Sequence, residues 1–383
     1  MEGSDLFRII LFDVDGVLLS EERCFDTSAL TVWELLFSPD YLGLPGENFT
    51  PVPDEEVIHN VRRRIFQDDQ ILIWLKERGT NSNWDMVFLV FSTHLLHLLR
   101  ELQPKYPEVI NHVLNPGAKI TVLQELGAII RENNISYTPQ YEHFLEIFSK
   151  STAQKQELLL YLNEIAGHWL GIETSFFSKH SPVWEWGRSI YQEWYLGDHL
   201  FQKTEGIPPR RKGKKGFLYQ EIPLANPKKI RDVLEEARRR GATLGIGTGR
   251  PALETEIPLK ELDLWSSFDS NRIITATDVI RAEEAHPERA PLGKPQPFTF
   301  VKGYFGRQKS DTDCLEETLP LSQMEDVLVV GDSVADLMAA RKMGCCFAAT
   351  LTGLTGTKAR ATFEELGADY ILKDITQLPR IFE

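Results

Sequence analysis

Short apolar runs that end in polar residues occur in two separated parts of this sequence. The first run, residues 7–13, is largely apolar, as expected for a parallel-sheet strand that is covered on both faces. From residue 226 onward, capped helical patterns alternate with further runs of this kind. This alternation predicts an α/β fold, a doubly wound and Rossmann-like parallel sheet with helices on both faces.

The elements expected after the first strand follow from periodicity and from glycine and proline positions. The predicted strands are residues 242–249, 272–280 (a strand and a loop), 324–333, 345–351 and 368–372. The predicted helices between them are residues 226–241, 252–265, 334–344 and 358–367.

Between the first strand and the second, the sequence has a different character. Residues 25–205 contain mostly helical patterns, at 55–79, 84–102, 118–133, 141–148, 153–171 and 182–201. A proline-, glycine- and lysine-rich stretch near 205–220 is expected to be a linker, with the basic run 210–215 exposed to solvent. We therefore predict a core formed by residues 1–20 and 221–383, and an inserted all-helical domain formed by residues 21–220.

Composition limits the possible partners and locations. The chain has 383 residues and a formal charge of −14, which argues against general nucleic-acid binding. Its four cysteines have no metal-ligand spacing and suggest a reducing compartment. The longest apolar stretch, residues 86–99, is too short to span a bilayer, and the N-terminus lacks a signal-peptide pattern. We expect a cytoplasmic protein with no membrane partner.

Acidic residues follow two of the predicted strands. Asp13 and Asp15 end the first strand, and Asp332 and Asp336 follow the run at 324–333. Loops at the carboxyl ends of parallel strands lie side by side, so these four side chains are expected to meet. Crowded carboxylates repel one another, and a hard cation such as Mg²⁺ relieves that repulsion. The sequence therefore predicts a Mg²⁺ site at this edge of the sheet.

Four motifs, DVDGV, GTGR, GKPQP and GDSVAD, occur in that order and begin at residues 13, 247, 293 and 331. Together they resemble the signature motifs of the haloacid dehalogenase (HAD) superfamily. The resemblance covers residues 6–19 and about 220–379. The Asp-x-Asp pair resembles the phosphomonoesterase and phosphomutase branches. In that family a helical cap can follow the first motif, and the insertion here is much longer than the compact bundles usual at that place.

The resemblance implies a role for each matching residue. Asp13 would be the nucleophile that forms an aspartyl-phosphate, and Asp15 would protonate the leaving oxygen and then accept a proton from water. Thr248 would hydrogen-bond the transferring phosphoryl group, with the backbone N–H of Gly249 close by. Lys294 would neutralise charge around Asp13 and the phosphoryl group.

The resemblance also implies the metal ligands. Asp13 would bind Mg²⁺ through its carboxylate and Asp15 through its backbone carbonyl. Asp332 would be a further ligand, and Asp336 would support the ion directly or through water. The expected function is a Mg²⁺-dependent phosphatase that acts on a small phosphorylated metabolite. A phosphosugar mutase and a regulatory protein that retains the same core are the alternatives.

Other residues have simpler expected roles. Arg250 either touches substrate or pairs with a carboxylate, and the sequence leaves both possibilities open. His94 and His97 lie on one predicted helix without evident partner ligands, so we expect packed or solvated histidines. The aromatic residues between 184 and 195 are expected to pack in the core of the helical domain.

Overall fold

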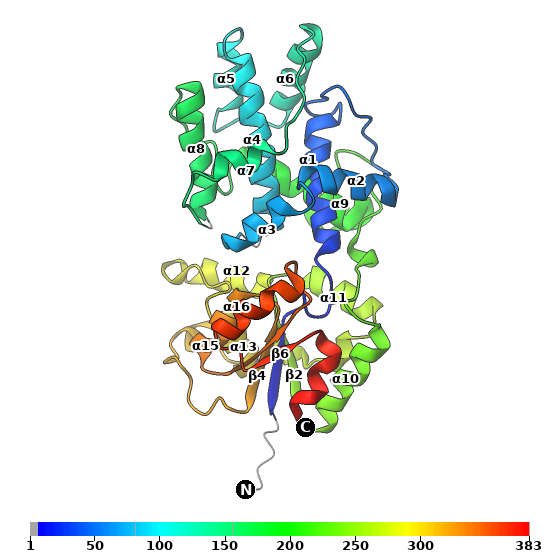
Figure 1. Ribbon diagram of the computed structural model, residues 1–383, viewed down its shortest axis with the longest axis vertical. Coiled ribbons are helices and arrows are strands. Elements are labelled where there is room, and N and C mark those ends of the chain that lie inside the picture. The colour runs from blue at the N-terminus through cyan, green and yellow to red at the C-terminus, as the bar shows by residue number, and fades with distance from the viewer. Residues whose placement is uncertain (1–6, 81, 155, 383) are drawn as a thin grey trace. The chain divides into compact units, whose positions relative to one another are not determined.

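The computed structural model describes residues 7–80, 82–154 and 156–382. The chain forms two compact units (Figure 1). The sheet unit contains the chain up to Glu21 and again from Leu218 onward, and the helical unit is Glu22–Phe217.

The sheet unit is built on six parallel strands in the order β3-β2-β1-β4-β5-β6. The strands are β1 (Ile9–Phe12), β2 (Thr243–Gly247), β3 (Ile273–Ile274), β4 (Val327–Gly331), β5 (Cys346–Thr350) and β6 (Tyr370–Leu372). The predicted doubly wound parallel sheet is therefore confirmed. The N-terminal strand β1 lies between β2 and β4, which come more than two hundred residues later in the sequence.

Side chains of β1 alternate between the two faces of the sheet. Ile10 and Phe12 pack into a core with α10 (Pro227–Arg239) and the C-terminal 3₁₀ segment η6 (Ile375–Phe382). Ile9 and Leu11 pack into a second core with side chains from the helices of the other face. The helices that contribute to this second core are α12 (Ala276–Ala285), α13 (Phe298–Phe305), α14 (Asp311–Leu315), α15 (Val334–Met343) and α16 (Ala359–Glu365). Burial on both faces explains why this strand is apolar without alternation.

Three parts of the sheet unit differ from the expectation. No helix or strand was expected for residues 281–323, where the structure has the end of α12 and the helices α13 and α14. Residues 272–280 were expected to form a strand and a loop, but β3 has only two residues and is followed directly by α12. Thr275 and Asp278 form a reciprocal capping box that starts this helix, which explains why the chain turns helical there. The predicted helix at 252–265 ends earlier, as α11 (Ala252–Glu261), and is followed by a single 3₁₀ turn.

The described part of the helical unit contains helices and connecting turns. Its helices are α1 (Glu22–Phe37), α2 (Glu55–Ile65), α3 (Gln70–Glu77), α4 (Asn83–Leu102), α5 (Pro107–Val113), α6 (Thr121–Glu132), α7 (His143–Phe148), α8 (Gln156–Leu170) and α9 (Pro182–Glu205). The described helices include none that combines the length and the apolar character needed to cross a membrane.

The single helix expected over residues 55–79 is wrong. Residues 67–69 have positive φ angles of 51°, 51° and 65°, which separate α2 from α3. Left-handed backbone cannot continue a right-handed helix, although the apolar periodicity runs through both segments. The aromatic residues of α9 are buried as expected: Trp184, Trp186, Tyr191, Trp194 and Tyr195.

The basic run at 210–215 is not wholly exposed. Lys214 is buried, and its Nζ lies 2.8 Å from an oxygen of Glu34 and 2.6 Å from an oxygen of Glu193. The run returns along α9 because Gly197 breaks the helical backbone there, with φ 76° and ψ 163°. A Cβ on Gly197 would lie 2.5 Å from the carbonyl oxygen of Lys215, so only glycine permits this close crossing.

Candidate active site

The predicted site residues follow neighbouring strands at one edge of the sheet. Phe12, the last residue of β1, lies opposite Ile246 of β2 and Val330 of β4. The backbone N–H of Asp13 continues the ladder by donating to the Val330 carbonyl over 2.9 Å. The loops that begin at Asp13, Thr248 and Asp332 therefore leave the sheet side by side.

Asp13 is a buried carboxylate held by two donors. Its Oδ1 accepts a hydrogen bond of 2.7 Å from the backbone N–H of Val14, and its Oδ2 lies 2.6 Å from Lys294 Nζ. Burial raises the pKa of Asp13 to about 7, against the lowering effect of Lys294 and with a further rise from the nearby Asp336 charge. Without a further cation, this site is therefore unfavourable for an ionised Asp13.

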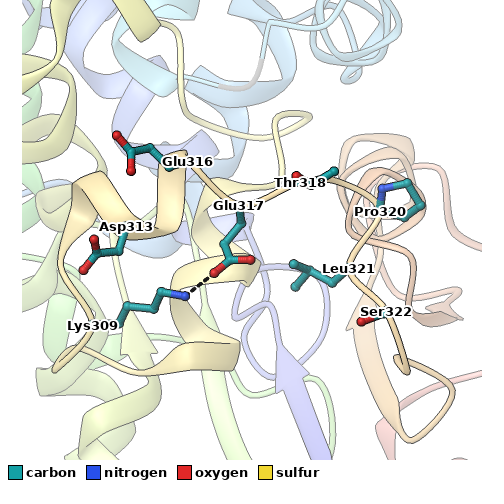
Figure 2. Close-up of a pocket in the computed structure, with 8 residues that line it drawn as sticks. All are labelled: Lys309, Asp313, Glu316, Glu317, Thr318, Pro320, Leu321 and Ser322. Atoms are coloured by element: carbon teal, nitrogen blue, oxygen red, sulfur yellow. Dashed lines mark hydrogen bonds and ion pairs between the residues drawn. The ribbon is translucent and has the colours of Figure 1, made fainter.

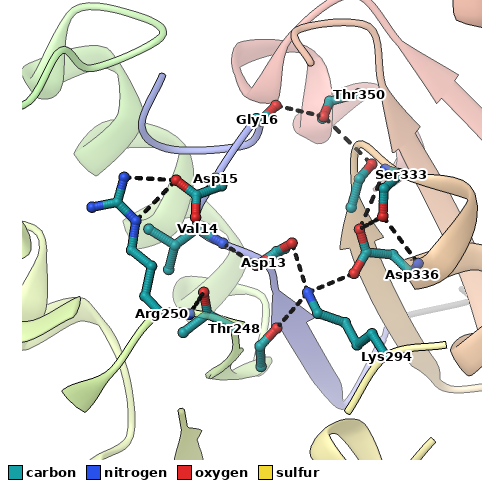
Figure 3. A network of polar contacts seen from close by, with 12 residues as sticks. Asp13, Val14, Asp15, Gly16, Thr248, Arg250, Lys294, Ser333, Asp336 and Thr350 are labelled. Atoms are coloured by element: carbon teal, nitrogen blue, oxygen red, sulfur yellow. Dashed lines mark hydrogen bonds and ion pairs between the residues drawn. The ribbon is translucent and has the colours of Figure 1, made fainter. Parts of the chain in front are cut away.

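Lys294 lies between two carboxylates (Figure 3). Besides contacting Asp13, its Nζ lies 2.7 Å from Asp336 Oδ1 and donates to the Gly247 carbonyl over 3.3 Å. Burial alone would lower the pKa of Lys294, but the charges of Asp13 and Asp336 outweigh it, and the net shift is upward. Lys294 is thus a fixed positive charge at the end of β1.

Asp336 is held at the first turn of α15. It forms a capping box with Ser333, whose hydroxyl donates to Asp336 Oδ2 over 2.6 Å. Oδ2 is therefore used by the helix cap, while Oδ1 contacts Lys294. Its side chain is fully buried, so its position is set by these bonds rather than by solvent.

Asp332 fits a space that two glycines leave open. A Cβ on Gly16 would lie 2.1 Å from the Asp332 carboxylate, and a Cβ on Gly353 would lie 2.2 Å from its Oδ2. Thr350 and Thr352 donate hydroxyl hydrogen bonds to the Gly16 carbonyl, at 3.1 and 2.5 Å, and so fix this loop. The backbone at Gly16 and Gly353 thus leaves room for the Asp332 side chain.

Three of the four predicted acidic side chains come together. Oxygen atoms of Asp13, Asp332 and Asp336 all lie within 4.8 Å of one another, and no other group of three such ligand residues occurs in the part of the chain that the structure describes. An all-oxygen donor set, in which burial and, to a smaller extent, the neighbouring carboxylates raise the pKa of Asp13, suits a hard divalent cation such as Mg²⁺. The residues therefore fit the metal that the sequence predicts.

The loop after β2 brings Thr248 and Gly249 to the same edge. Thr248 is buried, and its hydroxyl oxygen accepts a hydrogen bond of 3.2 Å from the backbone N–H of Arg250. A Cβ on Gly249 would meet no atom within 4 Å, so the backbone there borders open space. Both residues lie where the sequence places phosphate-binding groups, and their roles stay predictions.

The side chain of Asp15 does not join the other three carboxylates. Its Oδ1 accepts two hydrogen bonds from Arg250, from Nε at 2.9 Å and from Nη2 at 2.6 Å. Figure 3 shows Asp15 turned toward Arg250, while Asp13 faces Lys294. Of the two possibilities left open for Arg250, the structure shows the carboxylate pair.

Two site residues were not foreseen from the sequence. Ser333 caps α15 and orients Asp336, and its Ser-x-x-Asp spacing could have indicated this role. Glu221 accepts a hydrogen bond of 2.8 Å from Arg250 Nη1. It lies in a segment with no motif, so no sequence signal pointed to it.

Other candidate features lie away from this edge. The surface hollow in Figure 2 is lined by residues between Lys309 and Ser322 and contains none of the predicted site residues. In the helical unit, the His97 ring stacks on that of His143, with ring centroids 5.0 Å apart. Face-to-face rings do not aim their nitrogens at one ion. The chemistry that the structure offers is thus concentrated at the carboxyl edge of the sheet.

Comparison with known proteins finds a matching family model and similar solved structures. The HAD-hydrolase-like family matches residues 291–378. A crystal structure from the Northeast Structural Genomics Consortium is 37% identical in sequence, covers 98% of both chains and has a TM-score of 0.83. No curated protein matches this sequence.

More distant solved structures include two named hydrolases. One is a predicted phosphoglycolate phosphatase from Haemophilus somnus, which is 13% identical over 100% of both chains with a TM-score of 0.41. Another is a HAD-superfamily hydrolase from Geobacter sulfurreducens, which is 14% identical over 100% of this chain and 99% of that one, with a TM-score of 0.40. Both are too distant to bear on the substrate of this chain.

Proposed function

The chain belongs to the haloacid dehalogenase superfamily of hydrolases, and from that premise we propose that it is a Mg²⁺-dependent phosphomonoesterase. In this proposal it acts on a small phosphorylated metabolite through an aspartyl-phosphate on Asp13. The proposal also places the protein in the cytoplasm and gives it no nucleic-acid or membrane partner.

One observation carries the proposal. A largely buried lysine, Lys294, bridges Asp13 and Asp336, at 2.6 and 2.7 Å, and Asp332 completes a group of three carboxylates within 4.8 Å. Phosphoryl transfer depends mainly on alignment and on stabilisation of negative charge. A fixed lysine beside a nucleophilic carboxylate, with ligands for a divalent ion, supplies both.

The first step would use Asp13 and Asp15. An oxygen of Asp13 attacks the phosphorus, and the bond between phosphorus and the ester oxygen breaks. Asp15, as a general acid, gives its proton to the departing oxygen, which leaves as an alcohol. Val14 N–H and Lys294 hold the Asp13 carboxylate in place for this attack, since they contact its two oxygens at 2.7 and 2.6 Å.

The second step would regenerate the enzyme. The Asp15 carboxylate takes a proton from a water molecule, whose oxygen attacks the phosphorus and breaks its bond to Asp13. Inorganic phosphate leaves, and both aspartates return to their starting forms. Lys294 neutralises charge on the phosphoryl group in both steps, and Thr248 and the Gly249 N–H orient its oxygens. When bound to Asp13, Asp332, Asp336 and the Asp15 carbonyl, Mg²⁺ would favour the ionised carboxylates and polarise the phosphoryl group.

We further propose that the helical unit selects the substrate. It is inserted shortly after the Asp13–Asp15 loop, and the chain returns to the sheet unit at Leu218. The segment at Leu18–Ser20 pairs with the returning segment at Ile222–Leu224, through Ser20 N–H to Ile222 O at 2.8 Å and Leu224 N–H to Leu18 O at 3.1 Å. An insertion in this place can restrict which phosphorylated molecules reach Asp13.

A panel of phosphomonoesters, assayed for released phosphate with and without Mg²⁺, tests the proposal. We expect phosphate release from at least one small metabolite, loss of that release on chelation, and its loss in Asp13→Asn. Circular dichroism of the variant should match that of the wild type.

The alternatives give different outcomes in the same assay. A sugar monophosphate that is isomerised in the presence of its bisphosphate, without release of phosphate, would indicate a mutase. A regulatory protein would release no phosphate from any panel member, and Asp13→Asn would leave its cellular effects unchanged.

A further inference from the structure

The contact between Arg250 and Asp15 falls on one oxygen only. Arg250 donates from both Nε and Nη2 to Asp15 Oδ1, at 2.9 and 2.6 Å. Oδ2 has no hydrogen-bond or ion-pair partner among the described residues. A carboxylate held in this way has a fixed rotamer and one distinct, available oxygen.

Arg250 is itself fixed from its other side. Its Nη1 donates to Glu221 Oε1 over 2.8 Å and reaches the Glu254 carbonyl over 3.4 Å. The side chains of Arg250 and Glu221 are 4% and 1% exposed, whereas that of Asp15 is 26% exposed. Glu221, Arg250 and Asp15 thus form a row of three charged side chains, in which the buried pair of Glu221 and Arg250 supports the more accessible carboxylate of Asp15.

Glu221 lies in the sheet unit, close to where the chain returns from the helical unit. It is three residues beyond Leu218, where the chain re-enters the sheet unit, and next to Ile222, which pairs with Ser20. Asp15 also lies in the sheet unit, seven residues before the helical unit begins at Glu22. Arg250, in the loop that carries Thr248, therefore contacts the sheet-unit segment before the insertion and the one after it.

We propose that Arg250, held by Glu221, is a positioning residue that grips Oδ1 of Asp15 so that Oδ2 exchanges the proton with the leaving group and with water. This inference rests on the proposed phosphatase function and deepens it. Arg250 acts on Asp15 and does not bind the phosphoryl group.

The two roles for Arg250 predict different kinetics. A positioning residue for the general acid matters most when the leaving oxygen is basic and needs its proton. A phosphate-binding residue contributes to every phosphomonoester alike, because each carries the same phosphoryl group. Phenyl phosphate and para-nitrophenyl phosphate separate the roles, since phenolate is much more basic than para-nitrophenolate and the two esters are similar in size.

The experiment compares kcat and KM for both esters in the wild type, Arg250→Lys and the double variant Arg250→Met with Glu221→Gln. The double variant removes both buried charges together and so avoids an unpaired Glu221. General acids contribute roughly 10²- to 10⁴-fold, so we expect kcat on phenyl phosphate to fall at least about 10-fold. On para-nitrophenyl phosphate we expect kcat and KM to change by less than about 3-fold, since that leaving group needs little acid.

Glu221→Gln alone tests the support for Arg250. It keeps the size of the side chain but removes the negative charge that holds Nη1 of Arg250. It should therefore give the same leaving-group dependence with a smaller loss of kcat. Arg341→Lys is the matched control, because Arg341 also pairs with an aspartate, Asp369 at 2.9 Å, but lies outside the site. It should leave both rates unchanged, and thermal melts should confirm that each variant is folded.

A double-mutant cycle with Asp15→Asn shows whether Arg250 acts through Asp15. Once Asp15 is an amide, Arg250→Lys should cause no further leaving-group-dependent loss. The inference is overturned if kcat falls equally on both esters, if KM rises for both, or if Arg250→Lys causes the same loss in the Asp15→Asn background. Turnover by the wild type would still preserve the proposed function. Absence of phosphate release from every ester by the wild type would overturn the proposed function, and this inference with it.

Discussion

Each unit contains a buried lysine between two carboxylates, and the two clusters differ in their surroundings. In the sheet unit, Lys294 lies 2.6 Å from Asp13 and 2.7 Å from Asp336, with side chains 12%, 9% and 0% exposed. In the helical unit, Lys214 lies 2.8 Å from Glu34 and 2.6 Å from Glu193, and all three side chains are fully buried.

The clusters share their charge pattern but differ in access and in composition. The sheet cluster lies at the ends of strands and has a third carboxylate, Asp332, in reach of the same point. The helical cluster is closed off, with Lys214 Nζ over the ring of Trp194 at 5.1 Å from its centroid. A buried ion triad can take part in catalysis only where substrate and metal reach it. We expect catalysis at the first and stability from the second.

Replacing a carboxylate by an amide should abolish turnover in the sheet cluster and leave turnover unchanged in the helical cluster. Asp13→Asn should lower phosphatase turnover at least about 10⁴-fold, since a nucleophile is lost, with little change in melting temperature. Glu34→Gln should leave turnover within about 2-fold of wild type, because the helical triad takes no part in chemistry. Steady-state phosphate release and thermal melts measure both. A large activity loss in Glu34→Gln would remove the distinction between the clusters.

Removing the lysine should separate the clusters by stability. Lys214→Met leaves two buried carboxylates without their cation and should lower the free energy of unfolding by about 3–5 kcal/mol. Lys294→Met should mainly abolish turnover, because its carboxylates lie at the edge of the sheet. Urea denaturation followed by circular dichroism gives the stability of each variant.

The matched control replaces the whole helical triad. Lys214→Met combined with Glu34→Gln and Glu193→Gln should recover most of the lost stability, since no unpaired charge remains. If Lys214→Met unfolds at the same urea concentration as wild type, the triad does not hold the helical unit together.

The third carboxylate of the sheet cluster should determine the metal requirement. Asp332→Asn should raise the Mg²⁺ concentration for half-maximal activity about 10- to 100-fold. Glu193→Gln should leave that concentration unchanged. Phosphate release titrated with Mg²⁺ measures it, and an unaltered requirement in Asp332→Asn would contradict the ligand assignment.

The smallest expected effect is a pH dependence of stability in the helical unit. Burial raises the pKa of Glu34 from 4.5 to about 7, against the opposing influence of Lys214. The folded state therefore binds this proton more tightly than the unfolded state, so this carboxyl's contribution to stability is fully present below pH 4.5 and is lost as pH rises to about 7. Glu34→Gln should remove this pH dependence of the free energy of unfolding, which amounts to a change on the order of 2 kcal/mol over the range. Urea midpoints across this range measure it, and parallel profiles for variant and wild type would exclude Glu34 as the source.

Much of the fold was predictable because it depends on local patterns. Apolar runs identified β1, β2, β4, β5 and β6, and the polar residues at their ends pointed to the candidate site. The break between α2 and α3 was missed, since apolar periodicity does not report the left-handed backbone at residues 67–69. The start of α12 was missed because its capping box follows a strand of only two residues.

The site was predictable where a residue is part of a motif and not where a partner comes from elsewhere. Asp13 and Lys294 carry motif positions, so their roles could be proposed before the structure was known. Glu221 and Lys214 lie in segments without motifs, and both are buried by contacts that their neighbours in sequence do not reveal.

The order of residues along the chain was enough to specify a parallel sheet, an inserted helical region and the edge where acidic side chains gather. Only the tertiary structure decided which side chains form ion pairs within that framework. Asp15 pairs with Arg250, 235 residues away, rather than joining Asp13, and Lys214 is buried beside Glu34, 180 residues away. The physical reason is that periodicity records which face of an element is apolar, whereas ion pairs depend on packing between elements distant in sequence.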